Sequence, residues 1–312
     1  MVKFTGETQG TYYAVTYFEK DGRSYQTEID SLLHDFDLSV SMWVPQSIIS
    51  KINRNEPNVV ADGHFLGNYN LSKQVYEKTD GAFDPTVAPL VNAWGFGFKD
   101  RMHVDKKVVD SLLPLVGFNH VKIVDNKVVK NDPRIQFDFN AVAQGYSVDL
   151  VVNFLKSKGV KACLVDIGGE VMTYGNKPDG SFWKVGIEKP KDNAAYGEGL
   201  KAIVELENKA LATSGSYRKF YEENGMRYSH TINPKTGYPV QHSLLSVSVL
   251  ADSCGLADAF ATAFMVLGVD ESKHILEENP YLEAYFIFSD EKGNLQTYVT
   301  KGFRGIIIEE MD

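Results

Sequence analysis

The chain of 312 residues has few cysteines, few arginines and no long apolar segment. Its two cysteines, Cys163 and Cys254, stand far apart in apolar runs, without the CxxC or metal-ligand spacing of a redox or zinc motif. We expect two buried thiols, with a disulfide as the alternative. No run of about 18 uncharged apolar residues occurs, so the sequence predicts no membrane-spanning segment.

Positive charge is also scarce. The chain has 41 acidic against 32 basic residues, a formal net charge of -9, and only seven arginines. Because binding to a phosphate backbone requires concentrated positive charge, this composition argues against nucleic acid as a partner. An acidic protein that binds an anionic cofactor must neutralise it locally, with a divalent cation, helix N-termini or glycine-rich turns.

The common nucleotide-binding and hydrolase motifs are absent as well. The sequence contains no GxGxxG fingerprint, no GxxxxGK[ST] P-loop and no GxSxG nucleophile elbow. The two glycines of IGGE (167–170) follow a predicted buried strand and would allow a ligand to approach the backbone closely. Neither standard nucleotide fold is therefore supported.

Hydrophobic periodicity predicts a mixture of strands and helices along the chain. Strands are expected at 11–18, 136–139, 162–169, 183–188, 202–207, 210–213, 244–250, 283–288 and 296–299, with a hairpin at 121–130. Helices are expected at 25–36, 45–55, 65–78, 104–113, 141–158 and 255–267, and from Pro85, with Asp84 as its N-cap. This order predicts an α+β fold of mixed sheets with flanking helices, in two lobes around a cleft.

The strongest local signal is ADAFATAF (257–264), which falls on a predicted helix. Asp258 and Thr262 are four residues apart and therefore lie on one face of that helix. Carboxylate and hydroxyl oxygens are ligands that Mg²⁺ prefers. The alternative is a helix with an exposed aspartate and a core of small residues.

Two other segments offer places for a cofactor. In DFNAVAQGYSVD (138–149) a strand gives way to a helix, with Asn140 as its N-cap, and the helix start could receive phosphate. In DGAFDP (80–85) an aromatic ring beside a carboxylate could stack on a ligand ring and accept its N–H donors. The alternatives are an ordinary capped helix and an ordinary turn.

A fourth region combines the small polar turn TSGS (213–216) with SHTINPKTGYPV (229–240). His230 titrates in a range that suits proton transfer near neutral pH. A hydrogen-bonded structural histidine is the alternative.

Together, these signals follow an order that resembles the ApbE family of FAD:protein FMN transferases. Seven blocks carry the resemblance, from about residue 6 to residue 300: GETQGTYY (6–13), DGAFDPTVAPLVNAWGFG (80–97), DFNAVAQGYSVD (138–149), DIGGEV (166–171), ATSGSYR (212–218), HTINPKTGYPV (230–240) and DSCGLADAFATAFMVLG (252–268). The resemblance implies one ApbE-like domain over residues 1–312, with two intertwined subdomains as the alternative.

The resemblance also implies an activity and a set of site residues. Family members bind FAD with Mg²⁺ and move FMN onto a Ser or Thr hydroxyl of an acceptor flavoprotein, releasing AMP. The implied metal ligands are Ala141, Asp258, Ala261 and Thr262. The implied FAD contacts are Gln9, Trp43, Ala82, Phe83, Asp84, Asp138, Gln144 and Ile232. His230 is the candidate proton acceptor, and Asp258 is the second catalytic residue.

The chain departs from the family pattern at a few of these positions. Gln9 stands where the family often has Met, Asn140 and Ala141 where it has Gly-Gly, Gln144 where it has Lys or Glu, and Asn233 where it has Asp. The family's acceptor motif, Asp-x-x-[ST]-Gly-Ala-[ST], is absent here, so we do not expect the chain to flavinylate itself.

Three alternatives accompany this reading. The same pocket could serve a Mg²⁺-dependent FAD pyrophosphatase that yields free FMN and AMP, or a flavin-binding protein without catalysis. We expect a cell-envelope, periplasmic location, with a leader and lipid anchor absent from this chain, because many family members are exported lipoproteins; a cytoplasmic location is the third alternative.

Overall fold

The structure, a computed structural model, describes residues 1–97, 104–190, 199–215, 220–223, 226–229 and 231–311. These residues form two compact units, and each unit is discontinuous in sequence. The first unit contains residues 1–34, 144–218 and 243–312. The second contains residues 35–143 and 219–242. Each unit is described by itself below.

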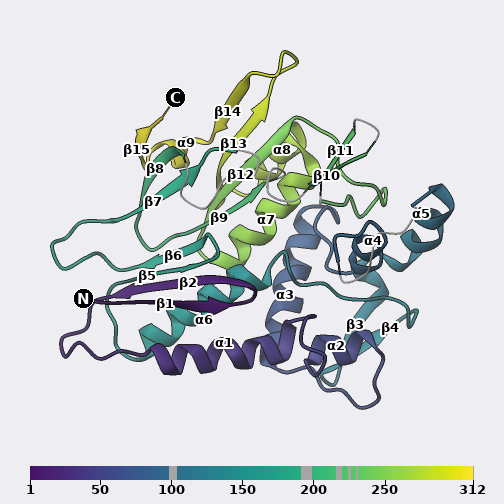
Figure 1. The fold of residues 1–312 in the computed structure, drawn as a ribbon, viewed down its shortest axis with the longest axis horizontal. Coiled ribbons are helices and arrows are strands. Elements are labelled where there is room, and N and C mark those ends of the chain that lie inside the picture. Colours follow the sequence, from purple (N-terminus) through teal and green to yellow (C-terminus); the bar gives the residue numbers. More distant parts are fainter. Residues whose placement is uncertain (98–103, 191–198, 216–219, 224–225, 230, 312) are drawn as a thin grey trace. The chain divides into compact units, whose positions relative to one another are not determined.

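One large sheet organises the first unit (Figure 1). Its strands lie in the order β1-β2-β5-β6-β9-β12-β13-β14, and each strand is antiparallel to its neighbours. Their bounds are β1 (Val2–Thr8), β2 (Thr11–Tyr17), β5 (Cys163–Ile167), β6 (Glu170–Tyr174), β9 (Ala210–Gly215), β12 (Leu244–Ala251), β13 (Glu283–Ser289) and β14 (Leu295–Val299).

Helices cover one face of this sheet. They are the first half of α1 (Gln26–Val40), α6 (Ala143–Ser157) and α7 (Cys254–Leu267), with α8 (Val269–Glu278) following α7. Alternate residues of β2, Tyr13 and Val15 among them, form one buried cluster with the apolar face of α6. Cys163 and Cys254 belong to the same cluster, and both thiols are buried and free. The expectation of two buried thiols is therefore confirmed.

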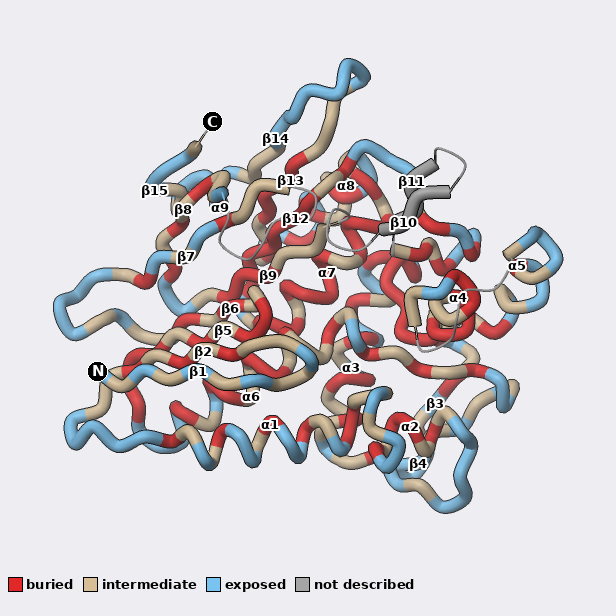
Figure 2. The backbone as a smooth tube through the Cα atoms, viewed as in Figure 1, coloured by how far each residue is buried: buried red, intermediate tan, exposed pale blue. Residues whose placement is uncertain are grey.

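A second, three-stranded sheet packs on the other face. Its order is β15-β8-β7, with β7 (Trp183–Glu188), β8 (Leu200–Leu206) and β15 (Ile307–Glu310), and α9 (Lys301–Arg304) precedes β15. Val204 of β8 packs with Leu211 of β9 and Tyr285 of β13 in one cluster. Helix α7 contacts β12 on one face of the main sheet, and Leu250 of β12 belongs to this cluster on the other face. Strand β12 is therefore buried along almost its whole length (Figure 2).

The second unit consists mainly of short helices. They are α2 (Ile48–Asn53), α3 (Gly63–Lys78), α4 (Ala88–Ala93) and α5 (Lys106–Leu112), with single 3₁₀ turns at Leu113–Leu115 and Phe118–His120. Two hairpins join them: β3 (Val121–Val124) with β4 (Lys127–Lys130), and β10 (Phe220–Glu223) with β11 (Met226–Ser229). Phe65 of α3 packs edge-on against Phe137 and Phe139, which form the core beside the candidate site.

The predicted α+β class is confirmed, and most predicted elements are present within a few residues. The 121–130 hairpin turns at Asp125 and Asn126, which both have positive φ, as a tight hairpin requires. Among the described residues, no helix is long and apolar enough to cross a membrane. Strands β1, β6, β10, β11 and β15 and helices α8 and α9 have no counterpart among the predicted elements.

Four local predictions are wrong. No strand forms at 136–139, because Phe137 bonds to the Asn53 side chain and Asp138 N bonds to Pro85 O instead of to a neighbouring strand. The helix expected from Pro85 begins at Ala88, and Asp84 does not cap it. The helix expected from Ala141 begins at Ala143, and the Asn140 backbone instead donates to Asp138 Oδ1 at 2.7 Å. Ser214 and Gly215, expected in the TSGS turn after a strand at 210–213, instead continue β9.

Candidate active site

Asp258 and Thr262 lie one turn apart on α7, as the sequence predicts. Asp258 is buried, with 7% of its surface exposed, and Thr262 is half-buried. Ser253 caps the helix by accepting from the Leu256 backbone N–H, so the helix begins one turn before Asp258. The small residues around Asp258, including Ala257 and Ala261, are fully buried.

The Asp258 carboxylate receives a backbone hydrogen bond from the neighbouring helix. Gly145 N donates to Asp258 Oδ2 at 3.0 Å. Gly145 is in the first turn of α6, where backbone N–H groups have no partner within the helix. Burial raises the pKa of the Asp258 carboxyl, because it disfavours the charged form, and the nearby negative charge of Asp149 raises it further.

The absence of a side chain at Gly145 lets the two helices approach this closely. A Cβ atom at this position would lie 2.4 Å from Cys254 O and 2.8 Å from Asp258 Cβ. Cys254 O belongs to the backbone and cannot swing aside. Glycine at 145 therefore sets the distance between α6 and the helix that carries Asp258.

A second contact fixes the same pair of helices. The Asp149 carboxylate accepts from Cys254 N at 2.7 Å and from Gly255 N at 2.9 Å. A carboxylate at the start of a helix both satisfies free N–H groups and complements the helix dipole. Asp149 was not among the predicted site residues, although it ends the DFNAVAQGYSVD block.

Thr262 faces strand β9. Its Oγ1 lies 3.4 Å from Ser214 Oγ. The adjacent Thr213 bonds instead to Ser248 of β12, with 2.7 Å between their hydroxyl oxygens. Ser214 and Thr262 thus place two hydroxyl groups on the same side of the sheet as α7.

Gln144 and Gln9 have contrasting surroundings. Gln144 Nε2 donates to Ile167 O at 2.8 Å and to the Glu170 carboxylate, so its amide nitrogen is already engaged. Gln9 sits at positive φ in the β1–β2 turn, and its Nε2 is buried without a hydrogen-bond partner among the described residues. Because buried donors are normally paired, this orphaned amide fits a ligand acceptor at Gln9.

In the second unit, Asp84 and Asp138 lie on two segments that touch. Asp138 N donates to Pro85 O at 2.7 Å. Asp84 Oδ1 accepts from Thr86 N at 2.8 Å and from the Thr86 hydroxyl at 2.6 Å. Burial raises the pKa of both carboxyls to about 6, because it disfavours their charged forms. A ligand N–H group that donates to either carboxyl would offset part of this cost of burial.

The segment that carries Asp138 is held by Asn53 of α2. Asn53 Nδ2 donates to Phe137 O at 2.8 Å, and Asn53 Oδ1 accepts from Phe137 N at 2.8 Å. Lys130 Nζ donates to Ile135 O at 2.9 Å on the same segment. These contacts position residues 135–138 against the DGAFDP loop. No motif in the sequence marks Asn53 for this role.

We expect Asn53→Ala to weaken FAD binding by about tenfold, because two buried Phe137 backbone groups lose their partners, at about 1–3 kcal/mol each, and Asp138 moves with them. Titration of FAD fluorescence measures the effect. Asn153→Ala, on the exposed side of α6, is the matched control and should bind FAD as the wild type does. Equal affinities of the Asn53 and Asn153 variants would show that Asn53 does not position the site.

The remaining predicted contacts of the second unit fall into two groups. Ala82 and Phe83 are buried next to Asp84, whereas Trp43 has 66% of its surface exposed. Ile232 is buried against Leu90 and Trp94, and it pairs with Pro239 across a single β-bridge. His230 lies outside the described residues.

The 231–240 loop is tied to the DGAFDP turn by polar contacts. Lys235 forms an ion pair with Asp80, and Trp94 Nε1 donates to Gly237 O at 2.9 Å. The second unit therefore brings together three of the predicted blocks. Ala141 also belongs to this unit, and it is half-buried just before α6.

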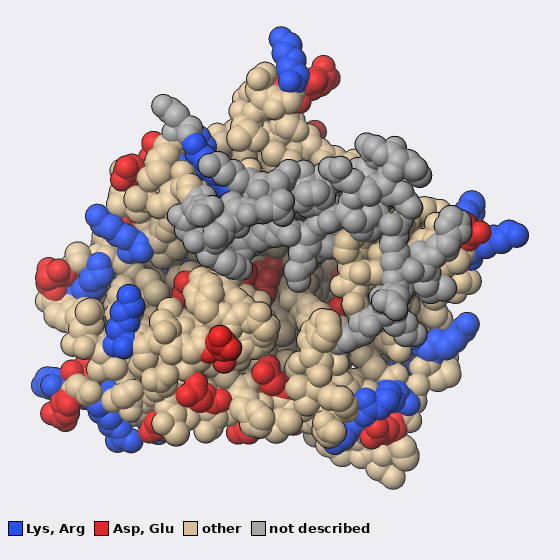
Figure 3. Space-filling view, viewed as in Figure 1, with Lys and Arg blue, Asp and Glu red and all other residues tan. Residues whose placement is uncertain are grey.

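The predicted contacts include no lysine or arginine, and the described residues contain no group of three or more His, Cys, Asp and Glu side chains arranged to hold a metal ion. Figure 3 shows basic side chains at separate points of the face drawn, often beside acidic ones. The ligand set implied by the resemblance has one carboxylate, a hydroxyl and backbone carbonyls. Asp258 fits such a set, because its buried carboxylate accepts only the Gly145 hydrogen bond among the contacts described.

The fold and these residues define an α+β protein with a buried carboxylate–hydroxyl pair on one helix. The chain belongs to the ApbE family, whose model matches residues 9–286. It is similar to proteins named FAD:protein FMN transferase from Vibrio cholerae, at 34% identity over 97% of this chain and 92% of that protein, and from Haemophilus influenzae, at 33% over 96% and 89%.

Solved structures agree with this membership. The flavin transferase ApbE from Vibrio cholerae has a TM-score of 0.86 and 32% identity, over 97% of this chain and 98% of that one. The flavinyl transferase ApbE from Pseudomonas stutzeri has a TM-score of 0.87 and 34% identity, over 99% and 97%. The family predicted from the seven sequence blocks is confirmed.

Proposed function

We propose that this protein is a Mg²⁺-dependent transferase that moves FMN from FAD onto a Ser or Thr hydroxyl of an acceptor protein and releases AMP. Membership of the ApbE family and the names of its relatives support flavin transfer. The observation that carries the Mg²⁺ dependence is the buried Asp258 carboxylate, one helical turn from Thr262 and without a cationic partner among its described contacts.

Asp258, Thr262 and the backbone carbonyls of Ala141 and Ala261 would hold Mg²⁺. When bound, the ion would neutralise charge on the FAD pyrophosphate. Gly145 N–H holds the Asp258 carboxylate in place. Gln9 offers its orphaned N–H to the cofactor, and Gln144 offers its amide oxygen, because its nitrogen is engaged with Ile167 and Glu170.

The transfer itself is a substitution at the FMN phosphorus. The acceptor hydroxyl oxygen forms a new bond to this phosphorus, the pyrophosphate P–O bond breaks, and AMP leaves with the bonding electrons. His230 takes the hydroxyl proton in this proposal. An acceptor segment of the type Asp-x-x-[ST]-Gly-Ala-[ST] supplies the hydroxyl.

Incubation with FAD and Mg²⁺, with and without an acceptor domain that carries this segment, tests the proposal. We expect AMP release and FMN-labelled acceptor in equal amounts, and loss of both when EDTA removes the metal. Mass spectrometry of the acceptor and chromatography of the nucleotides measure them. Rapid release of free FMN, independent of the acceptor, would instead identify a pyrophosphatase.

His230→Ala is expected to lower kcat for transfer by about a hundredfold or more, because general base catalysis contributes roughly that much, while FAD affinity changes little. Steady-state kinetics with FAD titration separate the two effects. His274→Ala, at an exposed position of α8, serves as the control. An unchanged kcat would assign His230 a structural role.

A further inference from the structure

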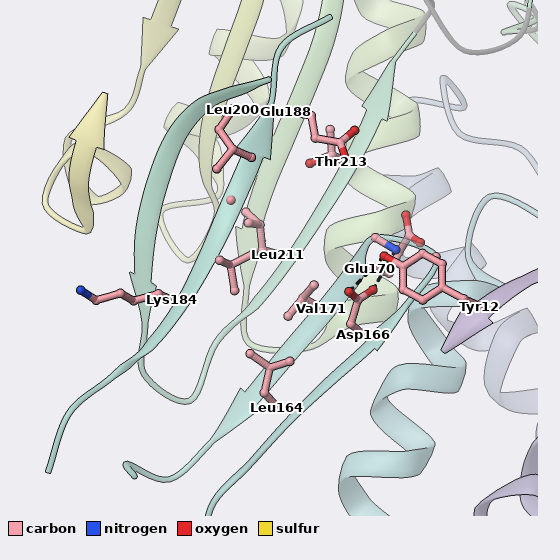
Figure 4. A pocket seen from close by; sticks show the side chains of 14 residues that line it. Tyr12, Leu164, Asp166, Glu170, Val171, Lys184, Glu188, Leu200, Leu211 and Thr213 are labelled. Atoms are coloured by element: carbon pink, nitrogen blue, oxygen red, sulfur yellow. Dashed lines mark hydrogen bonds between the residues drawn. The ribbon is translucent and has the colours of Figure 1, made fainter. Parts of the chain in front are cut away.

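A pocket of about 450 Å³ lies within the first unit, and none of the predicted FAD contacts lines it (Figure 4). Leu164, Val171 and Leu211 of the main sheet form its apolar floor. Strand β7 of the second sheet forms a wall with Lys184 and Glu188. Tyr12, Asp166, Gly168, Gly169, Glu170, Val185, Gly186, Leu200 and Thr213 complete the lining.

The pocket borders a stretch of β9 for which the described residues provide a paired strand on one side only. Strand β6 pairs with β9 only through Val171–Leu211 and Met172–Ala210, because β6 begins at Glu170. Strand β12 pairs with β9 along its whole length. Among the described residues, Ala212–Gly215 therefore have a hydrogen-bonded strand on one side and none on the other. Unpaired strand edges bind extended polypeptide by adding it to the sheet.

The two faces of β9 differ at this edge. Leu211 and Thr213 line the pocket, while Ser214 bonds to Thr262 on the α7 side. Side chains of a strand alternate between faces. A polypeptide added beside Ala212–Gly215 would thus direct one residue towards Thr262 and the residues before and after it into the pocket.

The charge of the pocket selects among occupants. Among the lining residues that the structure describes, the carboxylates of Asp166, Glu170 and Glu188 stand against one ammonium, that of Lys184. Asp166 accepts from the Tyr12 hydroxyl at 3.1 Å and from Gly169 N at 3.0 Å, and neither donor carries a charge. Lys184 also lies 4.0 Å from Glu205, a further carboxylate. The pocket therefore disfavours a pyrophosphate and favours a basic side chain.

We propose that the acceptor protein binds as an extended strand along the open edge of β9, with its accepting hydroxyl on the Thr262 side and a basic neighbouring side chain in the pocket. This inference rests on the proposed transfer function, and it names how that function's second substrate is recognised.

Peptides that contain Asp-Ala-Val-Thr-Gly-Ala-Thr followed directly by Lys, or by Glu in a matched twin, provide the probe. Fluorescence anisotropy with the full chain should show about fivefold tighter binding of the Lys peptide. N-methylation of successive peptide nitrogens should weaken binding by about tenfold at every second position, where the N–H faces β9, and little at the others. Absence of saturable binding, or an effect without alternation, would contradict the added strand.

A charge reversal at Glu188 tests whether the basic side chain of the peptide binds in this pocket. Glu188→Lys should reverse the preference, so that the Glu peptide binds more tightly, whereas Glu277→Lys on the exposed side of α8 should keep the wild-type preference. FAD titration is the companion measurement. If Glu188→Lys raises KM for FAD instead of altering peptide preference, the pocket belongs to FAD and the proposal fails. Transfer that persists without any peptide preference refutes this inference alone, whereas absence of all transfer refutes the proposed function.

Discussion

Asp258→Ala is expected to lower FMN transfer by at least about a thousandfold, equivalent to about 4 kcal/mol of transition-state stabilisation. The variant loses the one carboxylate among the proposed metal ligands, so that only the Thr262 hydroxyl and two backbone carbonyls remain to hold the ion. Initial rates of acceptor labelling at saturating FAD and Mg²⁺ measure the loss. Asp252→Ala is the matched control, because Asp252 is exposed just before α7 and pairs with Lys209.

Asp258→Asn separates the metal from the fold. Asparagine retains the shape and an acceptor for Gly145 N–H but carries no charge. We expect Mg²⁺ to raise the Tm of the wild type and to leave that of Asp258→Asn unchanged, because a ligand stabilises only the state that binds it. Wild-type transfer in Asp258→Ala, or an equal Mg²⁺ response in both proteins, would contradict the assignment.

The stability of the metal-free protein tests the same carboxylate through pH. Burial raises the pKa of Asp258 above its ordinary value of 3.8, so the folded chain binds this proton more tightly than the unfolded chain does. Stability is then lost as pH rises above that value. In EDTA, Asp258→Asn should therefore gain Tm relative to the wild type between about pH 4 and about pH 8. A constant difference across this range would show that Asp258 ionises in the folded chain as it does in the unfolded one.

The sequence predicts the parts of this site that lie along one element, and it misses those made between elements. Asp258 and Thr262 are found because a helix repeats every 3.6 residues, so their spacing alone places them on one face. Asn53 and Phe137 are 84 positions apart. No local pattern indicates that an amide at one position pairs with backbone groups at the other.

Element ends were predicted less well than element types, and the errors at Asp84 and Asn140 have one cause. Both residues belong to the class that caps helices, but such side chains and their neighbours equally form short local turns. Asp84 accepts from Thr86, two residues on, and Asp138 accepts from Asn140 in the same way. The competing turn therefore delays α4 and α6 by a few residues.

A glycine in the sequence can likewise mark either a turn or a close contact between two elements. The pair Gly168-Gly169 is readable as a turn after a buried strand, and both residues have positive φ. Gly145 looks like a weak helix residue, because glycine lowers helix propensity. The sequence does not show why alanine is excluded at position 145, because the atom that a Cβ would meet is the carbonyl oxygen of Cys254, more than one hundred positions away on α7.

Gly145→Ala should accordingly damage both stability and transfer. The added Cβ would lie 2.4 Å from Cys254 O and 2.8 Å from Asp258 Cβ, so α6 and α7 must separate. Overpacking of this kind costs about 1–3 kcal/mol, and the separation lengthens the Gly145–Asp258 hydrogen bond. We expect a Tm lower by about 4 °C and transfer reduced by about a hundredfold, measured by thermal unfolding and acceptor labelling.

Gly63→Ala makes the same chemical change where space is free. Gly63 begins α3, and no atom lies within 4 Å of the position of its missing Cβ. Alanine there should leave transfer intact and keep or raise Tm, because it favours the helix and restricts the unfolded chain. If Gly145→Ala behaves like Gly63→Ala in both measurements, close contact between α6 and α7 does not position Asp258. A lower Tm without a fall in transfer would show that Gly145 contributes to packing alone. A fall in both would show that Gly145 also positions the Asp258 carboxylate.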